Sequence, residues 1–156
     1  MIRITRETDY GIMLMTAMAQ QANQSYSAAA LAKQRRLSLP MVSKILKFLA
    51  RAGLLVSQRG SRGGYSLARL PEDISAADII DALEGPIAIT ECSSTGSQAC
   101  LHQNYCGVGG HWNRINRAIR EALENITLLE MSRPAPVLVS FPVLNRRTTT
   151  VSIDRP

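Results

Sequence analysis

The sequence predicts a mainly α-helical protein: a winged helix-turn-helix with a small two-stranded wing, followed by a cysteine loop and a long dimerisation helix. Of the 156 residues, 46% are hydrophobic but only 4% are aromatic, so the core is built from aliphatic side chains that suit packed helices. Three capped helical segments precede two short strands around a glycine-rich turn. A heptad pattern near residues 110–131 predicts the long helix.

Capping residues mark the first three helices. Thr5 is expected to begin the first helix, which should end near residues 22–24, and Ser27 opens a short second helix. Ser38 opens the third, in which Pro40 lies in the first turn where its missing N–H costs little. Gly53 is expected to close this helix as its C-cap.

The third helix has one apolar and one basic face. Its predicted buried stripe consists of Leu39, Val42, Ile45, Leu46 and Leu49. The opposite side carries Ser43, Lys44, Lys47 and Arg51, which suits a helix that enters a major groove. Two strands, LLVSQ and YSLAR, then surround the tip RGSRGG, where Arg59 and Arg62 are placed to reach phosphates or a narrow minor groove.

The charge is unevenly distributed along the chain. The net charge is +6, and no Asp or Glu occurs between Tyr10 and Pro71. The same stretch carries nine cations: Lys33, Arg35, Arg36, Lys44, Lys47, Arg51, Arg59, Arg62 and Arg69. A basic segment without acids is expected of a surface that faces nucleic-acid phosphates, although a solvated basic face is the alternative.

The second half of the chain divides into three segments. After a helix from Ser75 to Leu83, ended by Gly85-Pro86, comes the cysteine loop of residues 87–109. A narrow apolar stripe in residues 110–131 suits a helix that crosses a second copy of the chain, although packing on its own domain is the alternative. Residues 132–156 contain four prolines and are expected to form an extended or disordered tail; residues 1–86 form the winged-helix domain.

All three cysteines, Cys92, Cys100 and Cys106, lie within fifteen residues. The spacing leaves three uses open: an iron–sulfur cluster, a zinc site completed by His102 or His111, and a redox switch. Zinc modules usually contain Cys-x2-Cys knuckles, whereas the gaps here are seven and five residues, so the wider spacing favours a cluster.

Several of these motifs occur together in one known family. The opening IRITRETDYGI, the segment LAKQRRLSLPMVSKILKFLARAGLL, the wing QRGSRGGYSLAR, the segment ISAADIIDALEGP and the three cysteines before a Trp-led helix follow one another. In residues 1–131 the chain resembles the Rrf family of bacterial winged-helix regulators, which contains the iron–sulfur cluster regulator IscR and the nitric-oxide sensor NsrR. The most similar subgroup is the regulator of the SUF iron–sulfur assembly operon.

The resemblance implies a cluster held by the three cysteines, a 2Fe–2S rather than a 4Fe–4S cluster. The histidine that serves as fourth ligand in the IscR pattern is replaced here by Gly109, and seven residues rather than five separate the first two cysteines. The NsrR pattern places its fourth ligand, an aspartate from the partner subunit, at Asp9. Asp9 is therefore the first candidate, with His111 and His102 as alternatives.

The predicted function is a homodimeric transcription regulator that senses its iron–sulfur cluster, binds a palindromic operator in double-stranded DNA and represses iron–sulfur assembly genes of the SUF type. Nitric-oxide or redox sensing is the alternative within this class, and a cluster or zinc carrier with an acidic protein partner is the alternative outside it.

No catalytic triad, phosphate loop or paired carboxylates indicate an enzyme. A charged N-terminus and the lack of an apolar run near 18 residues predict a cytoplasmic protein without a membrane partner. The predicted DNA contacts are Ser38, Met41, Ser43, Lys44, Lys47, Arg59 and Arg62.

Overall fold

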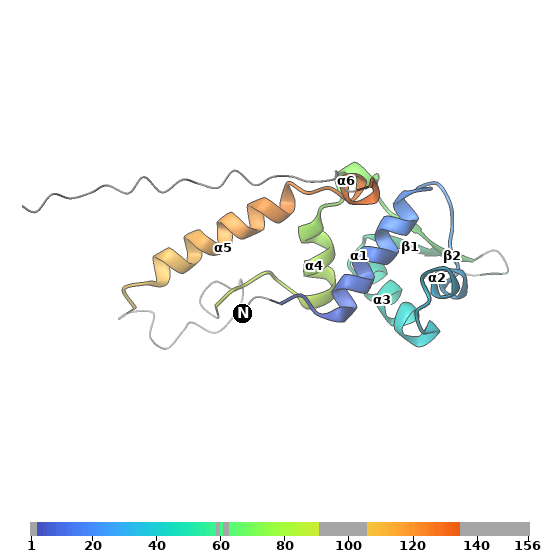
Figure 1. The fold of residues 1–156 in the computed structure, drawn as a ribbon, viewed down its shortest axis with the longest axis horizontal. Coiled ribbons are helices and arrows are strands. Elements are labelled where there is room, and N and C mark those ends of the chain that lie inside the picture. Colours follow the sequence, from blue (N-terminus) through green and yellow to red (C-terminus); the bar gives the residue numbers. More distant parts are fainter. Residues whose placement is uncertain (1–2, 59, 61–62, 91–105, 135–156) are drawn as a thin grey trace, which may run out of the picture.

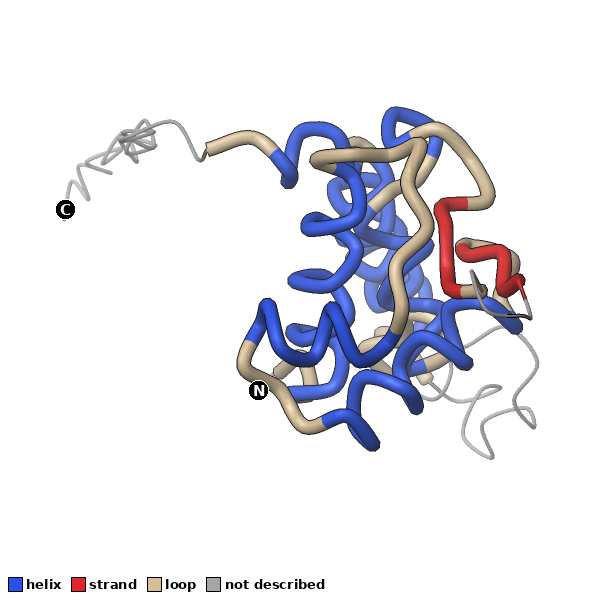
Figure 2. The backbone as a smooth tube through the Cα atoms, turned by 90° about the vertical axis from the view of Figure 1, so that its right-hand side faces the viewer, coloured by secondary structure: helices blue, strands red, loops and turns tan. Residues whose placement is uncertain are grey.

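The computed structural model describes residues 3–58, 60, 63–90 and 106–134. Within them the chain is mainly helical with one two-stranded antiparallel sheet, which confirms the predicted fold class (Figures 1 and 2). The elements are α1 (Arg6–Ala19), α2 (Ala28–Arg35), α3 (Leu39–Arg51), β1 (Leu55–Gln58), β2 (Gly64–Leu67), the 3-10 turn η1 (Pro71–Asp73), α4 (Ala76–Glu84), α5 (Gly109–Glu124) and α6 (Leu128–Ser132).

Local capping explains where most helices begin. The Thr5 hydroxyl accepts a hydrogen bond from the Thr8 N–H and Ser27 accepts one from Ala30, so α1 and α2 start where the sequence predicts. α3 begins after Ser38 as predicted and ends at Arg51; Gly53 follows its C-cap residue with φ of +75°. α1 ends at Ala19, earlier than the predicted residues 22–24, and residues 20–23 form turns.

Aliphatic side chains from several helices form one core. α1 packs against α3, α4 and α6, and α3 also packs against α2 and β1. The largest fully buried side chains are Leu14, Met15, Met18, Leu31, Val42, Ile45, Leu46, Leu49, Leu54, Ile74, Ile79 and Leu128. This core fixes α3 as a rigid platform with its polar side outward.

The wing is a short hairpin with one additional contact. Leu55 pairs with Leu67 and Gln58 with Gly64, close to the predicted strands. Tyr26, which precedes α2, forms an isolated bridge with Tyr65. A Cβ atom at Gly64 would lie 2.7 Å from the Tyr26 carbonyl oxygen, so only glycine lets the two segments approach this closely. The wing is therefore attached to the start of α2.

Leu39 does not belong to the buried stripe of α3. Val42, Ile45, Leu46 and Leu49 are fully buried as predicted, whereas the Leu39 side chain remains 47% exposed. Leu39 is the first residue of the helix. The hydrophobic core is contacted by the later turns of α3 and does not extend as far as this side chain. The prediction that Leu39 is a core residue was wrong.

The predicted single helix over residues 110–131 is divided in two. α5 ends at Glu124, and Thr127 and Glu130 form a capping box that starts α6. The Leu128 N–H donates to the Ile74 carbonyl at 2.7 Å, and the Leu128 side chain is fully buried. The chain thus returns to the core of the winged helix after α5.

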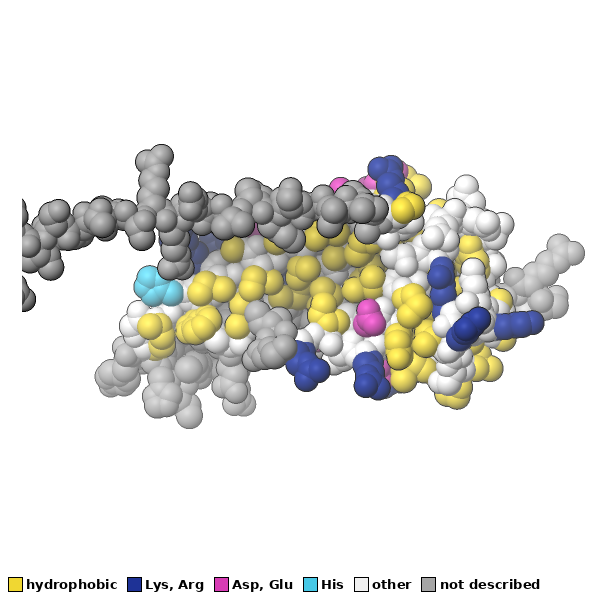
Figure 3. Space-filling model, viewed as in Figure 1, with side chains coloured by type: hydrophobic (Ala, Val, Ile, Leu, Met, Phe, Trp, Pro, Cys, Tyr) yellow, Lys and Arg dark blue, Asp and Glu magenta, His cyan; other side chains and the backbone are white. Residues whose placement is uncertain are grey.

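α5 lies at one end of the molecule and extends away from the helical core (Figure 1). None of its residues is buried, and its N-terminal half exposes Trp112 and Ile115. Hydrophobic side chains gather along this side of the molecule (Figure 3). Among the described residues, no helix is both long and apolar enough to cross a membrane.

Candidate DNA-reading surface and cluster segment

α2 and α3 form a helix-turn-helix. Arg36 directly follows α2. It adopts a left-handed conformation with φ of 54° and lets the chain reverse into α3 within two further residues. The Leu37 N–H donates to the Ala32 carbonyl at 3.0 Å, which closes the turn. The second helix of such a unit normally enters the major groove, so α3 is the candidate recognition helix.

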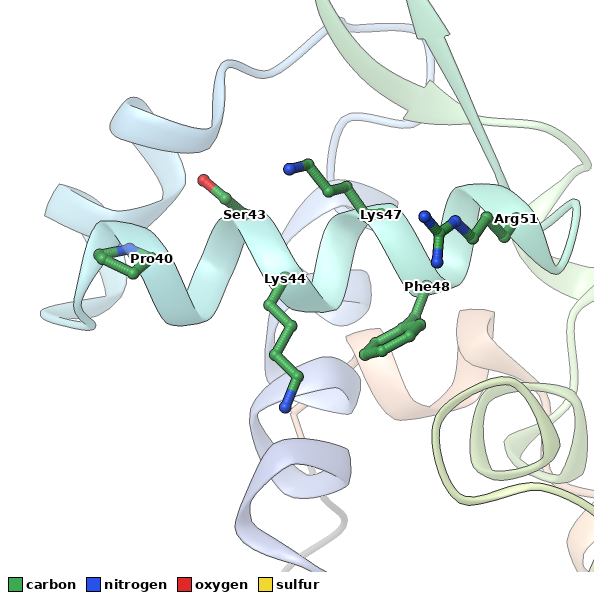
Figure 4. A pocket seen from close by; sticks show the side chains of 6 residues that line it. All are labelled: Pro40, Ser43, Lys44, Lys47, Phe48 and Arg51. Carbon is green, nitrogen blue, oxygen red and sulfur yellow. The ribbon is translucent and has the colours of Figure 1, made fainter.

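The outer side of α3 is a shallow hollow with a basic rim (Figure 4). Pro40 and Phe48 supply its apolar surface, and Lys47 and Arg51 extend from the same helix. Both cations are exposed. Since no acidic residue occurs anywhere in α2 or α3, this side of the protein attracts phosphate groups.

Lys44 points in another direction. Its ammonium group lies 2.7 Å from a carboxylate oxygen of Glu7 on α1 and 5.8 Å from the centroid of the Phe48 ring. Figure 4 shows Lys44 extending toward α1, whereas Ser43 and Lys47 extend toward the other side of α3. The 37 positions between Glu7 and Lys44 leave no local sequence signal for this ion pair.

The other predicted DNA contacts differ in exposure. Ser38 is exposed, and its hydroxyl makes no capping hydrogen bond. Ser43 is half-buried, and Met41 is half-buried against the hydrophobic core. Arg59 and Arg62 lie outside the described residues. Contact with DNA remains a prediction for all of these residues.

Of the predicted cluster ligands within one chain, the structure describes Cys106, Asp9 and His111. The Cys106 thiol is free and exposed, three residues before α5 begins. Asp9 is exposed on the first turns of α1, and His111 is exposed near the start of α5. Cys92, Cys100 and His102 lie outside the described residues. Within the described ranges of this single chain, no three Cys, His, Asp or Glu side chains come together as a metal site.

Asn116 fastens the segment that leads to the cysteines. Its side-chain amide donates to the Ile87 carbonyl at 3.1 Å and accepts from the Ile89 N–H at 3.2 Å. The same segment is bound to α4, because the Ile87 N–H donates to Asp81. Sequence reasoning missed this role for Asn116, and a polar residue on the apolar side of α5 was the only available signal.

Two further polar contacts join α4 to its neighbours. Arg120 of α5 donates to Asp81 at 2.9 Å, and this hydrogen bond raises the pKa of the guanidinium group. Glu84 accepts a hydrogen bond from the Thr5 N–H at 2.7 Å, which lowers the pKa of its carboxyl group. α5, α4, α1 and α3 are thus connected in sequence by Arg120–Asp81, Glu84–Thr5 and Glu7–Lys44.

Comparison with known proteins assigns the family. The family model Rrf2, an iron-dependent transcriptional regulator, matches residues 4–134. The chain belongs to the Rrf2 family. This Rrf2 protein is therefore a DNA-binding transcription regulator rather than an enzyme, and α3 with its wing is the part that such a fold presents to DNA.

Individual relatives cover most of this Rrf2 protein. It is similar to the regulator CymR of Bacillus subtilis, with 31% identity over 132 residues, 84% of this chain and 90% of the relative. It is also similar to the regulator IscR of Serratia proteamaculans, with 26% identity over 156 residues, 99% of this chain and 94% of the relative.

Solved structures share the fold. The structure of CymR, the global cysteine regulator of B. subtilis, has a TM-score of 0.66 at 31% identity and covers 85% of this chain and 97% of its own. The structure of T. potens IscR has a TM-score of 0.62 at 29% identity and covers 83% and 85%. Two regulators with different names thus share the architecture of this Rrf2 protein.

Proposed function

We propose that this Rrf2 regulator holds a labile 2Fe–2S cluster on Cys92, Cys100 and Cys106 and represses iron–sulfur assembly genes of the SUF type. The observation that carries the proposal is the free, exposed thiol of Cys106 directly before α5, with the other two cysteines only six and fourteen positions earlier in the sequence. Thiolates are the usual ligands of such clusters, and glycines near Cys106 give the inorganic sulfide access to backbone N–H groups.

Asp9 of the partner subunit is the proposed fourth ligand, with His111 as the alternative. Both side chains are exposed, as a ligand must be if the cysteines of another segment or another subunit hold the cluster. A carboxylate is a harder ligand than a thiolate and binds iron of a cluster less strongly. The edge of the cluster that Asp9 holds would be lost first under oxidation or iron scarcity, which suits a sensor.

A homodimer is the proposed form that binds DNA. Trp112 is 37% exposed and Ile115 is 42% exposed on α5, and neither is covered by the described part of its own chain. Burying these side chains against a second copy would gain about 25 cal/mol for each Å² of apolar surface. A two-fold dimer would present two α3 helices to the two halves of a palindromic operator.

The ion pair between α1 and α3 gives the cluster a route to DNA. Asp9 lies two residues after Glu7 on α1, and Glu7 holds Lys44 of α3. A bond from Asp9 to a cluster in the partner would therefore restrain the helix that contacts the recognition helix. Loss of the cluster would release this restraint and change the population of dimers whose two α3 helices fit the operator.

The test is anaerobic purification followed by absorption spectroscopy and analysis of iron, sulfide and zinc. Wild-type protein should be coloured and contain iron and acid-labile sulfide, and Cys106→Ala should lose both. Asp9→Ala and His111→Ala are the matched pair for the fourth ligand: only the variant that removes the ligand should make the cluster less stable in air. A colourless protein, or one that contains zinc in place of iron, would contradict the cluster proposal.

Regulation without a cluster is the second candidate function. It is favoured by the similarity to CymR of B. subtilis, which is a global cysteine regulator and matches at 31% identity. In that case the protein would be colourless, and replacing all three cysteines would leave its affinity for its own promoter unchanged.

A further inference from the structure

The first turn of α3 exposes apolar surface where a recognition helix meets DNA. Ser38, Leu39 and Pro40 are three consecutive exposed residues at the start of the helix. Leu37 and Met41 on either side of them pack against the hydrophobic core, but Leu39 does not and remains 47% exposed. A single exposed leucine is common on protein surfaces, so its position on the helix is what makes it informative.

The positions of Leu39 and Pro40 along α3 set the side of the helix on which each side chain lies. Pro40 lies on the outer side of α3, in the same hollow as Lys47 and Arg51 (Figure 4). Leu39 lies one turn before Ser43, on the flank beside that hollow. Lys47 and Arg51 follow on later turns and are placed to contact phosphates, which would set the depth at which the first turn enters the groove.

The chemistry of the major groove limits what Leu39 and Pro40 can recognise. Neither side chain donates or accepts a hydrogen bond, so neither reads the donors and acceptors of the base edges. The 5-methyl group of thymine is the apolar feature that a base pair presents in the major groove. We infer that Leu39 and Pro40 contact thymine methyl groups and make the regulator select T·A pairs at the corresponding positions of each half-site.

This inference concerns the reading of DNA and does not depend on a cluster. It adds two residues to the predicted contacts, of which one was expected to be in the core and the other only to start the helix. Ser38 beside them has a hydroxyl that makes no capping hydrogen bond and is available to a neighbouring base edge or phosphate. The preference for T·A pairs would differ from the base preference of a recognition helix that carries polar residues at positions 39 and 40, because polar side chains hydrogen-bond to base edges.

Uracil interference tests the inference. The full-length protein is footprinted on its own promoter, and each thymine of the footprint is then replaced by deoxyuridine, which removes only the methyl group. At contacted positions the wild-type protein should bind about fourfold more weakly, the factor that corresponds to about 0.8 kcal/mol for one buried methyl group. In Leu39→Ala and Pro40→Ala, the penalty should disappear at one or more of these positions and persist at the others.

Leu70→Ala is the matched control. Leu70 is 58% exposed, but it lies after the wing rather than on α3, so its replacement should leave every uracil penalty unchanged. Where a variant binds too weakly for the assay, lower salt restores affinity without changing which methyl groups are contacted. The inference is overturned if no uracil weakens wild-type binding, or if both α3 variants retain the complete wild-type pattern.

Discussion

The carboxylate of Glu7 holds the ammonium group of Lys44 at 2.7 Å and thereby joins α1 to the recognition helix. The two side chains are 38% and 52% exposed, so the pair contributes at most about 1 kcal/mol to folding. Its effect on position is larger, because it directs Lys44 away from the side of α3 that carries Lys47 (Figure 4). Lys44 would have to leave Glu7 before it could bind a phosphate.

Glu7→Gln should strengthen DNA binding. The substitution removes a negative charge next to α3 and releases Lys44, which then becomes available to a phosphate group. Affinity measured against salt concentration should show a steeper logarithmic slope, by about 0.9 for each additional phosphate that the protein neutralises. The double variant Glu7→Gln with Lys44→Ala should lose that additional slope. An unchanged slope in the single variant would mean that Lys44 does not reach DNA.

Lys47→Ala should weaken binding to all DNA sequences alike. Lys47 is exposed on the outer side of α3, and the structure records no ion pair for it among the described residues. Loss of one neutralised phosphate in each half-site should flatten the salt dependence by about 0.9 per phosphate. Arg117→Ala, at an exposed arginine on α5 rather than on the helix-turn-helix, is the control variant. A loss of affinity confined to the operator would instead assign Lys47 to base reading.

Features governed by local sequence were predicted well. The capping residues Thr5, Ser27 and Ser75 start helices where expected, because a cap acts within three positions. The break between α5 and α6 was also readable, as Thr127 and Glu130 have the spacing of a capping box, but the apolar period that continues through it outweighed that signal.

Long-range features could not be predicted in the same way. Leu39 has the helical spacing of a core residue, but it is exposed because the hydrophobic core does not extend as far as its side chain. The pairs Glu7–Lys44 and Glu84–Thr5 and the contacts of Asn116 join positions 27 or more apart, so they depend on the packing of whole helices. For the cluster ligands, sequence spacing remains the guide at Cys92 and Cys100, which lie outside the described residues.

Asn116→Leu should loosen the segment before the cysteines. The variant keeps a side chain of similar size but removes the hydrogen bonds to the Ile87 carbonyl and the Ile89 N–H. We expect the free energy of unfolding to fall by about 1 kcal/mol for each hydrogen bond lost, and hydrogen exchange at the Ile89 amide to become faster. Asn113→Leu, at an exposed position on the same helix, should leave exchange at Ile89 unchanged. Equal protection in both variants would show that Asn116 does not hold the segment.

Stability should depend on the ionisation of Glu84. The hydrogen bond from the Thr5 N–H lowers the pKa of this carboxyl group, so the unfolded chain binds the proton more readily than the folded protein does. The contribution of Glu84 is therefore complete at neutral pH and is lost as the pH falls below the ordinary value for glutamate, about 4.3, and through the lower folded value. Denaturant titrations should show Glu84→Gln to be less stable than wild type at pH 7. The difference in free energy of unfolding between the two proteins should shrink as the pH falls below the ordinary pKa of glutamate. Glu121→Gln, at an exposed position on α5, should show no such convergence.

Ile115→Arg should separate the proposed dimer into monomers. Ile115 is 42% exposed in the apolar stripe of α5, and a guanidinium group there would be buried without a partner in any interface that uses this stripe. Sedimentation should show one mass that corresponds to the 17.1 kDa chain, and operator affinity should fall at least about tenfold because each half-site is then bound alone. Glu121→Arg, which places the same group on the opposite side of α5, should remain dimeric. If Ile115→Arg sediments as a dimer and binds as wild type does, the apolar stripe of α5 is not the dimer interface.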